Sequence, residues 1–201
     1  MKNRFFFGIT LVGLSSIILS SCSSVPQAEI DTTKEAIEQA KAAGAEVYVH
    51  ENFIALQDSM DHVMINVESE KTKLFKNYTA VKEQLANVAL YAVEVKNLSE
   101  VRKEELNVEI QKTITEVKGL IESNRNLILE APKGKEGTTA LIAIKGEIDA
   151  IEISLNDATT QLASGDYIAT LDKTKAIKEK ASAINTELSE VIAKYNKGKK
   201  S

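Results

Sequence analysis

Cysteine occurs once in the 201 residues, tryptophan does not occur at all, and proline occurs only twice. With a single cysteine, no disulfide within the chain can stabilise the fold. Because there are also only nine glycines, long stretches contain no residue that breaks a helix. Alanine, glutamate, lysine, leucine and isoleucine dominate instead, a composition that favours long helices with coiled-coil character.

The chain also lacks an excess of positive charge. It has 25 lysines and arginines against 29 aspartates and glutamates, a formal net charge of −4. Two of the basic residues, Lys2 and Arg4, lie in the first 21 residues, so residues 22–201 carry 23 basic and 29 acidic side chains, a net charge of −6. A nucleic-acid partner would need a basic face, and this balance argues against one.

The main apolar run is short and lies at the N-terminus. After Lys2 and Arg4, residues 5–19 are mostly apolar but are interrupted by two glycines and two serines. A helix that crosses a bilayer needs about 20 apolar residues. A basic N-terminus, a short apolar core and small residues before a cleavage site are typical of an export signal, so residues 1–21 are predicted to be a signal peptide.

The only cysteine, Cys22, directly follows Leu19, Ser20 and Ser21. This order resembles the cleavage motif of bacterial lipoprotein precursors. The resemblance implies cleavage before Cys22, a diacylglycerol on its thiol, and a fatty acyl chain such as palmitate on the new amino terminus. Two or three acyl chains make such an attachment stable, because one chain holds only marginally. Ser23, in place of an aspartate, resembles the pattern that enteric-type bacteria sort to the outer membrane.

Two other interpretations of this segment stay open: an ordinary secretory signal with a cysteine by chance, and an uncleaved anchor helix. The lipoprotein interpretation places the mature chain in the bacterial cell envelope, attached by its lipid to the outer membrane and facing the periplasm. Residues 22–30 would then be a tether to a helical domain at 31–196.

Apolar residues recur at helical spacing through the first half of the mature chain. We expect a first helix from a cap within 31–33 to Gly44, and a second over 51–73. The segment 47–49 is undecided between a turn and a continuation of a helix.

The strongest helical pattern follows. Its members alternate steps of three and four residues, as in a coiled-coil seam: Leu74, Tyr78, Val81, Leu85, Val88, Ala92 and Val95. The pattern slips at 98–106 and then resumes. An unbroken helix over 74–131 would be roughly 85 Å long at 1.5 Å per residue. We expect a discontinuity at the slip, because a phase shift changes the face that the helix presents.

The second half repeats this style of pattern. A loop at 132–137 precedes a helix with a three-four seam, and Ser164, Gly165 and Asp166 end that helix and cap the last one. Residues 197–201 form a basic tail. The chain is therefore predicted to be all-α: an elongated antiparallel helical bundle with coiled-coil-like long helices. Its oligomeric state stays open, since such seams close within one chain or between chains.

Two stretches of the chain echo each other. Residues 76–81 and 165–170 both place a tyrosine, Tyr78 or Tyr167, between two apolar helical runs. The match is short, so two related hairpins and a chance similarity both stay open.

Alanines and a few larger residues recur through 31–95: Ala36, Ile37, Ala40, Ala43, Gly44, Ala45, Tyr48, Ala55, Tyr78, Leu85, Ala86 and Ala89. In this pattern the region, about a third of the mature chain, resembles the uncharacterised DUF4398-type helical domain of bacterial envelope lipoproteins. The resemblance implies an alanine-rich helix followed by a tetratricopeptide-like hairpin, and no activity. The chain departs from the family pattern at His50, where a proline is expected, and at Val81, where an alanine is expected. Some members carry an OmpA-like peptidoglycan-binding domain, and nothing here resembles one.

Candidate catalytic or metal-binding residues are few. The histidines are His50 and His62, and Asp58 lies one helical turn before His62, so the two share a face. No third ligand follows at a fixed spacing, so an exposed polar face is the expected role. The motifs of a serine nucleophile elbow and of a glycine-rich phosphate loop do not occur.

Other polar and aromatic residues also favour structural roles. Glu104, Glu105 and Glu109 stand among lysines and arginines, as on a solvated helix surface. Tyr78 and Tyr167 fit core or turn packing better than ligand stacking. The sequence therefore predicts no enzyme, no metal site, and no cofactor apart from the covalent lipid on Cys22.

The expected function is a structural or protein-interaction role, with membrane contact through the lipid and an envelope protein as partner. The alternative is a periplasmic module that holds an apolar or peptide ligand in a cavity between helices. The basic end at 194–200 adds two hypotheses beside a frayed terminus: contact with anionic headgroups, and a covalent link from Lys199 or Lys200 to peptidoglycan, as in the small helical lipoprotein that tethers the outer membrane.

Overall fold

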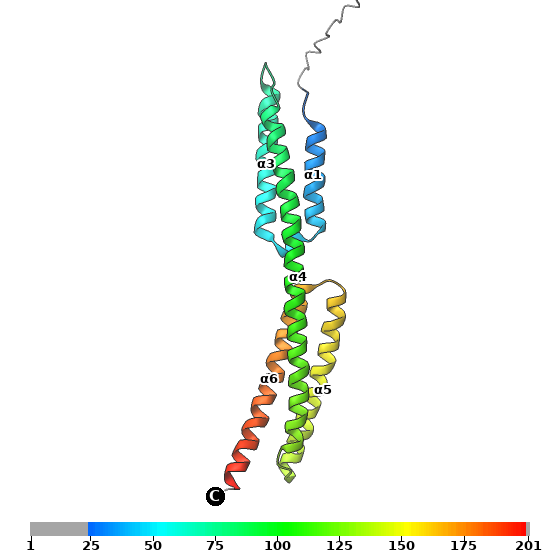
Figure 1. Ribbon diagram of the computed structural model, residues 1–201, viewed down its shortest axis with the longest axis vertical. Helices are drawn as coiled ribbons and strands as arrows, with labels where there is room; N and C mark the ends of the chain where they lie inside the picture. The colour runs from blue at the N-terminus through cyan, green and yellow to red at the C-terminus, as the bar shows by residue number, and fades with distance from the viewer. Residues whose placement is uncertain (1–23, 200–201) are drawn as a thin grey trace, which may run out of the picture.

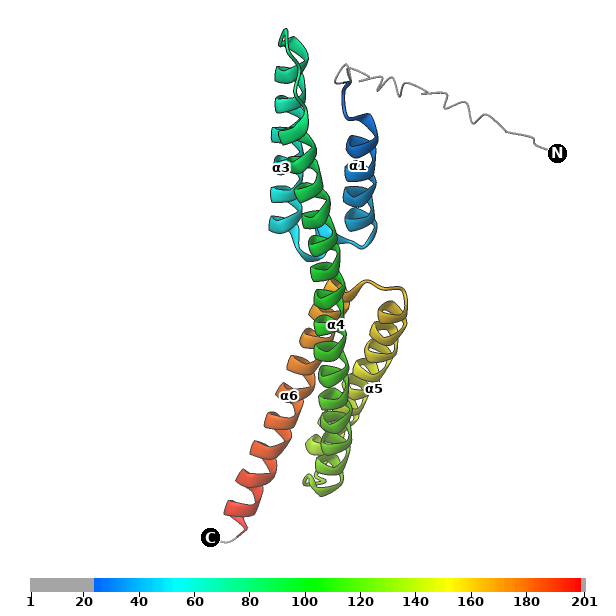
Figure 2. The same ribbon diagram turned by 45° about the horizontal axis from the view of Figure 1, so that its top comes forward.

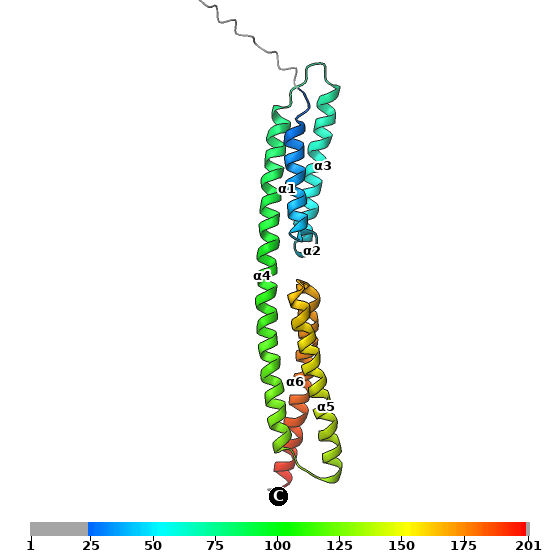
Figure 3. The same ribbon diagram turned by 90° about the vertical axis from the view of Figure 1, so that its right-hand side faces the viewer.

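The computed structural model describes residues 24–199, which form six α-helices and no β-strand. The helices are α1 (Gln27–Ala42), α2 (Ala45–Tyr48), α3 (His50–Thr72), α4 (Thr79–Glu130), α5 (Lys135–Ala163) and α6 (Tyr167–Gly198). The first half of α4 forms a bundle with α1 and α3, and its second half forms another with α5 and α6 (Figure 1). The bundles lie end to end along α4, so the molecule is a rod (Figure 3). The predicted elongated, antiparallel all-α bundle is confirmed.

The backbone of the rod is α4, a single helix of 52 residues. At 1.5 Å per residue it is about 78 Å long. It contains no proline and only one glycine, Gly119. The charged cluster at 102–105 is mostly exposed, and its arginine, lysine and glutamates are good helix formers. Nothing in the local sequence therefore interrupts the helix.

The buried side of α4 changes neighbours near Ser99. Up to Val95, its buried apolar residues belong to the core with α1 and α3, and from Leu106 they belong to the core with α5 and α6. The fully buried Ser99 donates a hydrogen bond from Oγ to the carbonyl oxygen of Ala43, just after α1 (2.8 Å). The discontinuity predicted at 98–106 was wrong. The slip in the seam marks a change of packing partners within one continuous helix.

The seam of α4 begins at Tyr78 and not at Leu74, its predicted first member. The side-chain oxygen of Asn77 accepts a hydrogen bond from the backbone N–H of Thr79 (3.0 Å), and α4 starts there. Leu74 and Phe75 lie in the loop between α3 and α4, 90% and 87% exposed. Spacing could not exclude Leu74, because it stands four residues before Tyr78 and so fits the same periodicity.

The first helix starts earlier than expected. It begins at Gln27, directly after Pro26, and the fixed φ of proline suits a helix start. Thr33, one of the predicted caps, lies inside α1 and is buried. Its hydroxyl lies within hydrogen-bond distance of the carbonyl oxygens of Glu29 (2.8 Å) and Leu85 (3.2 Å), and the second of these links α1 to α4.

The two predicted glycine turns are confirmed. Gly44 follows α1 with φ 86° and Gly165 follows α5 with φ 84°, a left-handed conformation that favours glycine. Asp166 then caps α6, because its Oδ1 accepts a hydrogen bond from the backbone N–H of Ala169 (3.3 Å). The undecided segment 47–49 includes the end of the short helix α2.

A buried amide fixes the register of α4 against α6. The Nδ2 of Asn124 donates to the carbonyl oxygen of Ala181 (2.9 Å), and the Nδ2 of Asn185 donates to the Oδ1 of Asn124 (2.7 Å). Asn124 is fully buried between the apolar seam residues Ile121 and Ile128. A shift of α6 by one turn would leave this amide without partners, at a cost of about 1–3 kcal/mol.

We expect Leu85→Ala and Leu188→Ala each to lower the free energy of unfolding by about 2–5 kcal/mol, because each leaves a cavity in a packed core. Leu85 is 0% and Leu188 1% exposed, in different bundles. Urea unfolding followed by circular dichroism measures both changes. Leu90→Ala, at a position that is 69% exposed on α4, is the control and should stay within about 0.5 kcal/mol of the wild type. Because α4 belongs to both cores, a single transition is expected, and separate transitions for the two bundles would contradict this coupling.

Candidate functional site

The predicted lipid-attachment motif, Leu19, Ser20, Ser21 and Cys22, lies outside the residues that the structure describes. The described chain begins at Ser24, at the end of the rod where the loop between α3 and α4 also lies (Figures 1 and 3). Only four residues lie between Cys22 and Gln27, the start of α1, and the five steps from Cys22 to Gln27 span at most about 17 Å in an extended chain. The described C-terminal end of α6 lies at the opposite end of the rod. A lipid on Cys22 would therefore attach the rod by one tip.

None of the helices in residues 24–199 combines the length and the apolar character that a membrane-spanning segment needs. The buried faces of these helices are taken up by the two cores.

The histidines do not form part of a metal cluster. The Nδ1 of His50, at the start of α3, lies 3.0 Å from the carbonyl oxygen of Glu46. Asp58 and His62 are both exposed on α3. Within residues 24–199, no group of three or more histidine, cysteine, aspartate or glutamate side chains is arranged to hold a metal ion.

The two tyrosines that echo each other in sequence have different surroundings. Tyr78, directly before α4, is 3% exposed and belongs to the core of the first bundle. Tyr167, the first residue of α6, is half-buried and packs against the second core. Both tyrosines stand at the start of the second arm of a helical hairpin, a position that the similarity between residues 76–81 and 165–170 suggested. The predicted packing role holds for both.

A cluster around Tyr48 joins the two bundles. The ring of Tyr48 meets the ring of Tyr167 edge to face, with the two centroids 6.1 Å apart. The hydroxyl of Tyr48 donates a hydrogen bond to the carbonyl oxygen of Gly165 (3.1 Å). The Nζ of Lys103 on α4 lies 5.5 Å from the centroid of the Tyr48 ring. Edge-to-face pairs and cation–π contacts each contribute about 0.5–1.5 kcal/mol. We call Tyr48, Lys103, Gly165 and Tyr167 the junction cluster.

Reasoning from the sequence alone missed the junction cluster. Tyr48 stood in a segment of undecided structure, and its partners lie far away in the chain. One signal was the preceding glycine. A Cβ on Gly44 would lie 2.9 Å from the Tyr48 ring, so this position needs glycine for space as well as for its positive φ.

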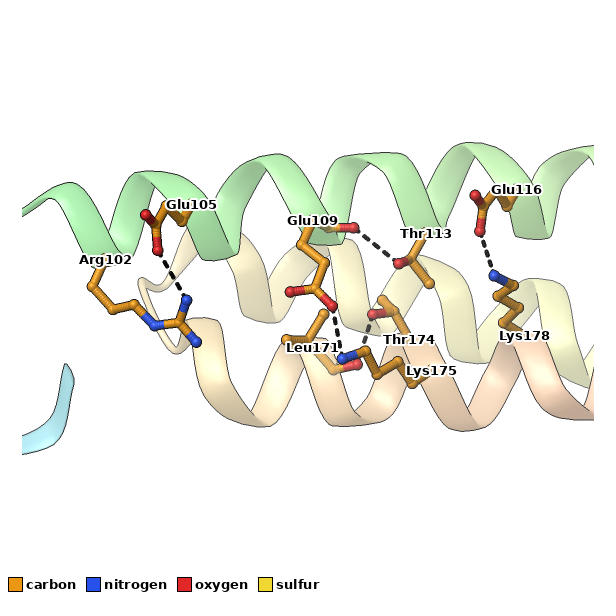
Figure 4. A network of polar contacts seen from close by, with 9 residues as sticks. All are labelled: Arg102, Glu105, Glu109, Thr113, Glu116, Leu171, Thr174, Lys175 and Lys178. Atoms are coloured by element: carbon orange, nitrogen blue, oxygen red, sulfur yellow. Dashed lines mark hydrogen bonds and ion pairs between the residues drawn. The ribbon is translucent and has the colours of Figure 1, made fainter. Parts of the chain in front are cut away.

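Ion pairs line the contact between α4 and α6. Glu109 pairs with Lys175 (2.7 Å) and Glu116 with Lys178 (2.5 Å), each carboxylate pointing from α4 toward α6 (Figure 4). Hydrogen bonds from these lysines lower the pKa of both glutamates below the ordinary value of 4.5.

The three glutamates expected on a solvated surface thus divide between two roles. Glu104 is exposed, and Glu105 pairs with Arg102 on its own helix (2.9 Å). Glu109 joins two helices through Lys175. All pairs in this region keep substantial contact with solvent, so their role is to align helices more than to stabilise the core.

Open grooves flank α5. The groove between α5 and α6 has a volume of about 450 Å³, a floor that includes the buried isoleucines Ile151, Ile177 and Ile184, and rims that carry Glu147 and Lys180. A second groove of about 320 Å³ lies between α4 and α5 around Ile128 and Leu129. Both are open to solvent. A small ligand is normally 70–90% buried in its site, so these grooves suit a peptide segment better.

The basic C-terminal end lies away from the tether. Toward its end α6 leaves α4 (Figure 2), and most residues of 189–198 are exposed. The helix continues to Gly198, further than predicted. Of the two lysines proposed for a peptidoglycan link, Lys199 follows α6 directly, and Lys200 lies outside the described residues.

We expect Tyr48→Ala to lower the free energy of unfolding by about 1–3 kcal/mol, because it removes the contacts that join the bundles. Hydrogen exchange at the turn 163–167 should also become faster, as that turn loses its partner. Both changes are measured on the purified chain, by urea unfolding and by mass spectrometry of exchange. Tyr195→Ala, at a position 52% exposed near the end of α6, is the matched control. Unchanged exchange at the turn in Tyr48→Ala would show that the cluster does not couple the bundles.

The lowered pKa values of Glu109 and Glu116 predict a pH dependence. A carboxylate with a lower pKa in the folded state stabilises the fold above its unfolded pKa of about 4.5, and this stabilisation is lost as the pH falls through the folded pKa. The variant Lys175→Met/Lys178→Met should therefore melt below the wild type at pH 7, with a smaller difference at pH 3. Lys194→Met, whose partner Glu190 is on the same helix, should show no such trend. A difference equal at both pH values would contradict the assignment.

Comparison with protein-family models, with curated proteins and with solved structures gave no match for this chain.

Proposed function

We propose that this chain is a lipid-anchored protein of the bacterial cell envelope, with a structural or protein-interaction role and no catalysis. The observation that carries the proposal is the rod itself: one continuous helix, α4, spans both bundles, and the chain enters at one tip. The Leu19-to-Cys22 motif adds the anchor, and Ser23 favours the outer membrane, with the body in the periplasm. A rod held by one tip keeps its far end at a distance from the bilayer.

The length of α4 sets that distance. About 78 Å of helix separates the end of the rod near the tether from the end of the second bundle. The junction cluster and the shared helix resist bending between the bundles. The protein would therefore act as a spacer that presents α5 and α6 to a partner away from the membrane.

The groove between α5 and α6 suits an amphipathic helix of an envelope protein as that partner. Its isoleucine floor can receive one apolar face, and Glu147 and Lys180 at the rims offer charges of both signs to the flanks. Helix-in-groove binding uses this combination of apolar anchors and polar flanks.

The runner-up is a module that holds an apolar or peptide ligand between helices. We expected an apolar cavity for this function. The described grooves have apolar floors but are open to solvent, and this openness favours a peptide over a small apolar molecule. A module that holds a peptide ligand in these grooves is therefore equivalent to the protein-interaction role proposed above.

The DUF4398-type resemblance fits the same proposal. Ala40 on α1 and Ala43 just after it are buried, and α3 and α4 follow as a hairpin with Tyr78 after the turn. The resemblance implies an alanine-rich helix and a hairpin in this order for residues 31–95. Membership of that family remains a proposal, and it adds no activity.

The test of the anchor is Cys22→Ala. We expect this variant to lose all acyl label and to leave the membrane fraction of the cells, because no thiol remains to carry the lipid. Mass spectrometry of the purified wild type should show a chain that begins at an acylated Cys22. Ser24→Ala is the matched control and should keep both the label and the location. An unmodified thiol in the wild type, or a leader still attached, would contradict the proposal.

The partner is tested in the same cells. A photo-crosslinking residue at Lys180, on the groove rim, should capture one envelope protein. Ala183→Arg, which places a large charged side chain at an exposed position that lines the groove, should abolish the capture. The same residue at Val108, 59% exposed on α4, should not capture it. Equal capture from both positions would contradict a specific role for the groove.

A further inference from the structure

The loop between α3 and α4 carries the two most exposed large apolar side chains of the described residues. Leu74 is 90% and Phe75 is 87% exposed. The core of the first bundle closes below them, since Val67 is the last buried residue of α3 and Tyr78 the next buried one along the chain. The two side chains therefore contribute nothing to the core. Their exposure to water is unfavourable in free energy, because apolar surface is more stable away from water.

Lysines surround this apolar pair. Residues 71–78 include Lys71, Lys73 and Lys76 and no acidic residue. Lys71 and Lys73 pair with Glu68 and Glu70, which stand on the helix side of the loop. An apolar tip with lysines just behind it suits the boundary of a bilayer, where apolar side chains enter the acyl region and ammonium groups meet anionic headgroups.

The position of the loop in the rod matches this chemistry. The loop lies at the same end as Ser24, the first described residue (Figures 1 and 3). The five steps from Cys22 to Gln27 span at most about 17 Å, so a lipid on Cys22 holds this end of the rod at the bilayer. Leu129, another exposed apolar residue, lies near the C-terminal end of α4, at the other end of the rod.

We propose that Leu74 and Phe75 insert into the bilayer that carries the lipid anchor, with Lys71, Lys73 and Lys76 against its anionic headgroups. This inference rests on the proposed anchor. The anchor turns insertion of the loop into an intramolecular step at high effective concentration, so a contact that is weak by itself becomes occupied. With two attachments at one tip, the acyl chains before α1 and the loop after α3, the rod loses freedom to lie down on the membrane.

The absence of tryptophan from the chain gives a direct test. The acylated Phe75→Trp protein is reconstituted in vesicles of phosphatidylglycerol and phosphatidylcholine, and in vesicles of phosphatidylcholine alone. On the anionic vesicles we expect its emission to shift to shorter wavelength and to be quenched by brominated acyl chains. Leu129→Trp, at a position 70% exposed at the other end of α4, is the control and should show neither effect. Both substitutions are at exposed positions, and circular dichroism verifies that each variant folds.

Each outcome of the experiment decides the proposal. Shielding of the tryptophan at position 75 on anionic vesicles supports it. Equal shielding on neutral vesicles supports insertion and overturns the role of the lysines. Emission identical to that of Leu129→Trp on both kinds of vesicle overturns insertion and leaves the loop to a protein partner.

A second measurement separates this inference from the anchor. The unacylated Cys22→Ala chain should bind anionic vesicles weakly, and Leu74→Ser/Phe75→Ser should lower that binding at least about tenfold, since two large apolar side chains are lost. If Cys22 is unmodified in cells but the loop substitutions still lower vesicle binding, the proposed lipid anchor is contradicted and the proposed insertion of the loop is supported. If Cys22 is acylated and the difference is not seen, the loop inference fails and the anchor stands.

Discussion

The fold depends on one long face of α4 being buried along nearly its whole length. Within residues 24–199, no other helix contributes fully buried residues to both cores: α1 and α3 cover the first part of that face, and α5 and α6 cover the rest. The helix propensity of its residues contributes only part of the stability of α4. Most of that stability comes from the packing of this buried face. The same helix runs through both bundles on either side of Ser99, and the proposed spacer role rests on this continuity.

Polar contacts then decide which helix meets which part of that face. Ser99 donates a hydrogen bond to the carbonyl oxygen of Ala43, just after α1, and Asn124 donates one to the carbonyl oxygen of Ala181 on α6. An apolar seam alone would tolerate a shift of one turn, whereas a buried hydrogen bond would be lost by it. The junction cluster adds a tie between the bundles that does not pass along α4, because Tyr48 reaches Gly165 directly.

The two ends of the rod carry different surfaces. The tether end has the start of α1 and the loop with Leu74 and Phe75, whereas the open grooves described here flank α5 in the second bundle. This division supports the proposal that one end belongs to the membrane and the other to a partner. The net negative charge of residues 22–201 and the basic stretch 71–76, at the end of α3 and in the loop after it, fit the same division.

By itself, the sequence determined the existence of the long helices, the turns at Gly44 and Gly165, and the buried seam of α4 from Tyr78 onward, because periodicity and turn chemistry are local properties of the chain. It also determined the candidate anchor at Cys22, which is a motif. It did not determine the short helix α2 or the start of α1 at Gln27. Only the tertiary structure decided that Leu74 is exposed although it fits the seam, since burial depends on where a neighbouring helix ends. The same holds for the change of partners near Ser99 and for the contact of Tyr48 with Tyr167, which joins residues more than a hundred positions apart that no local pattern connects.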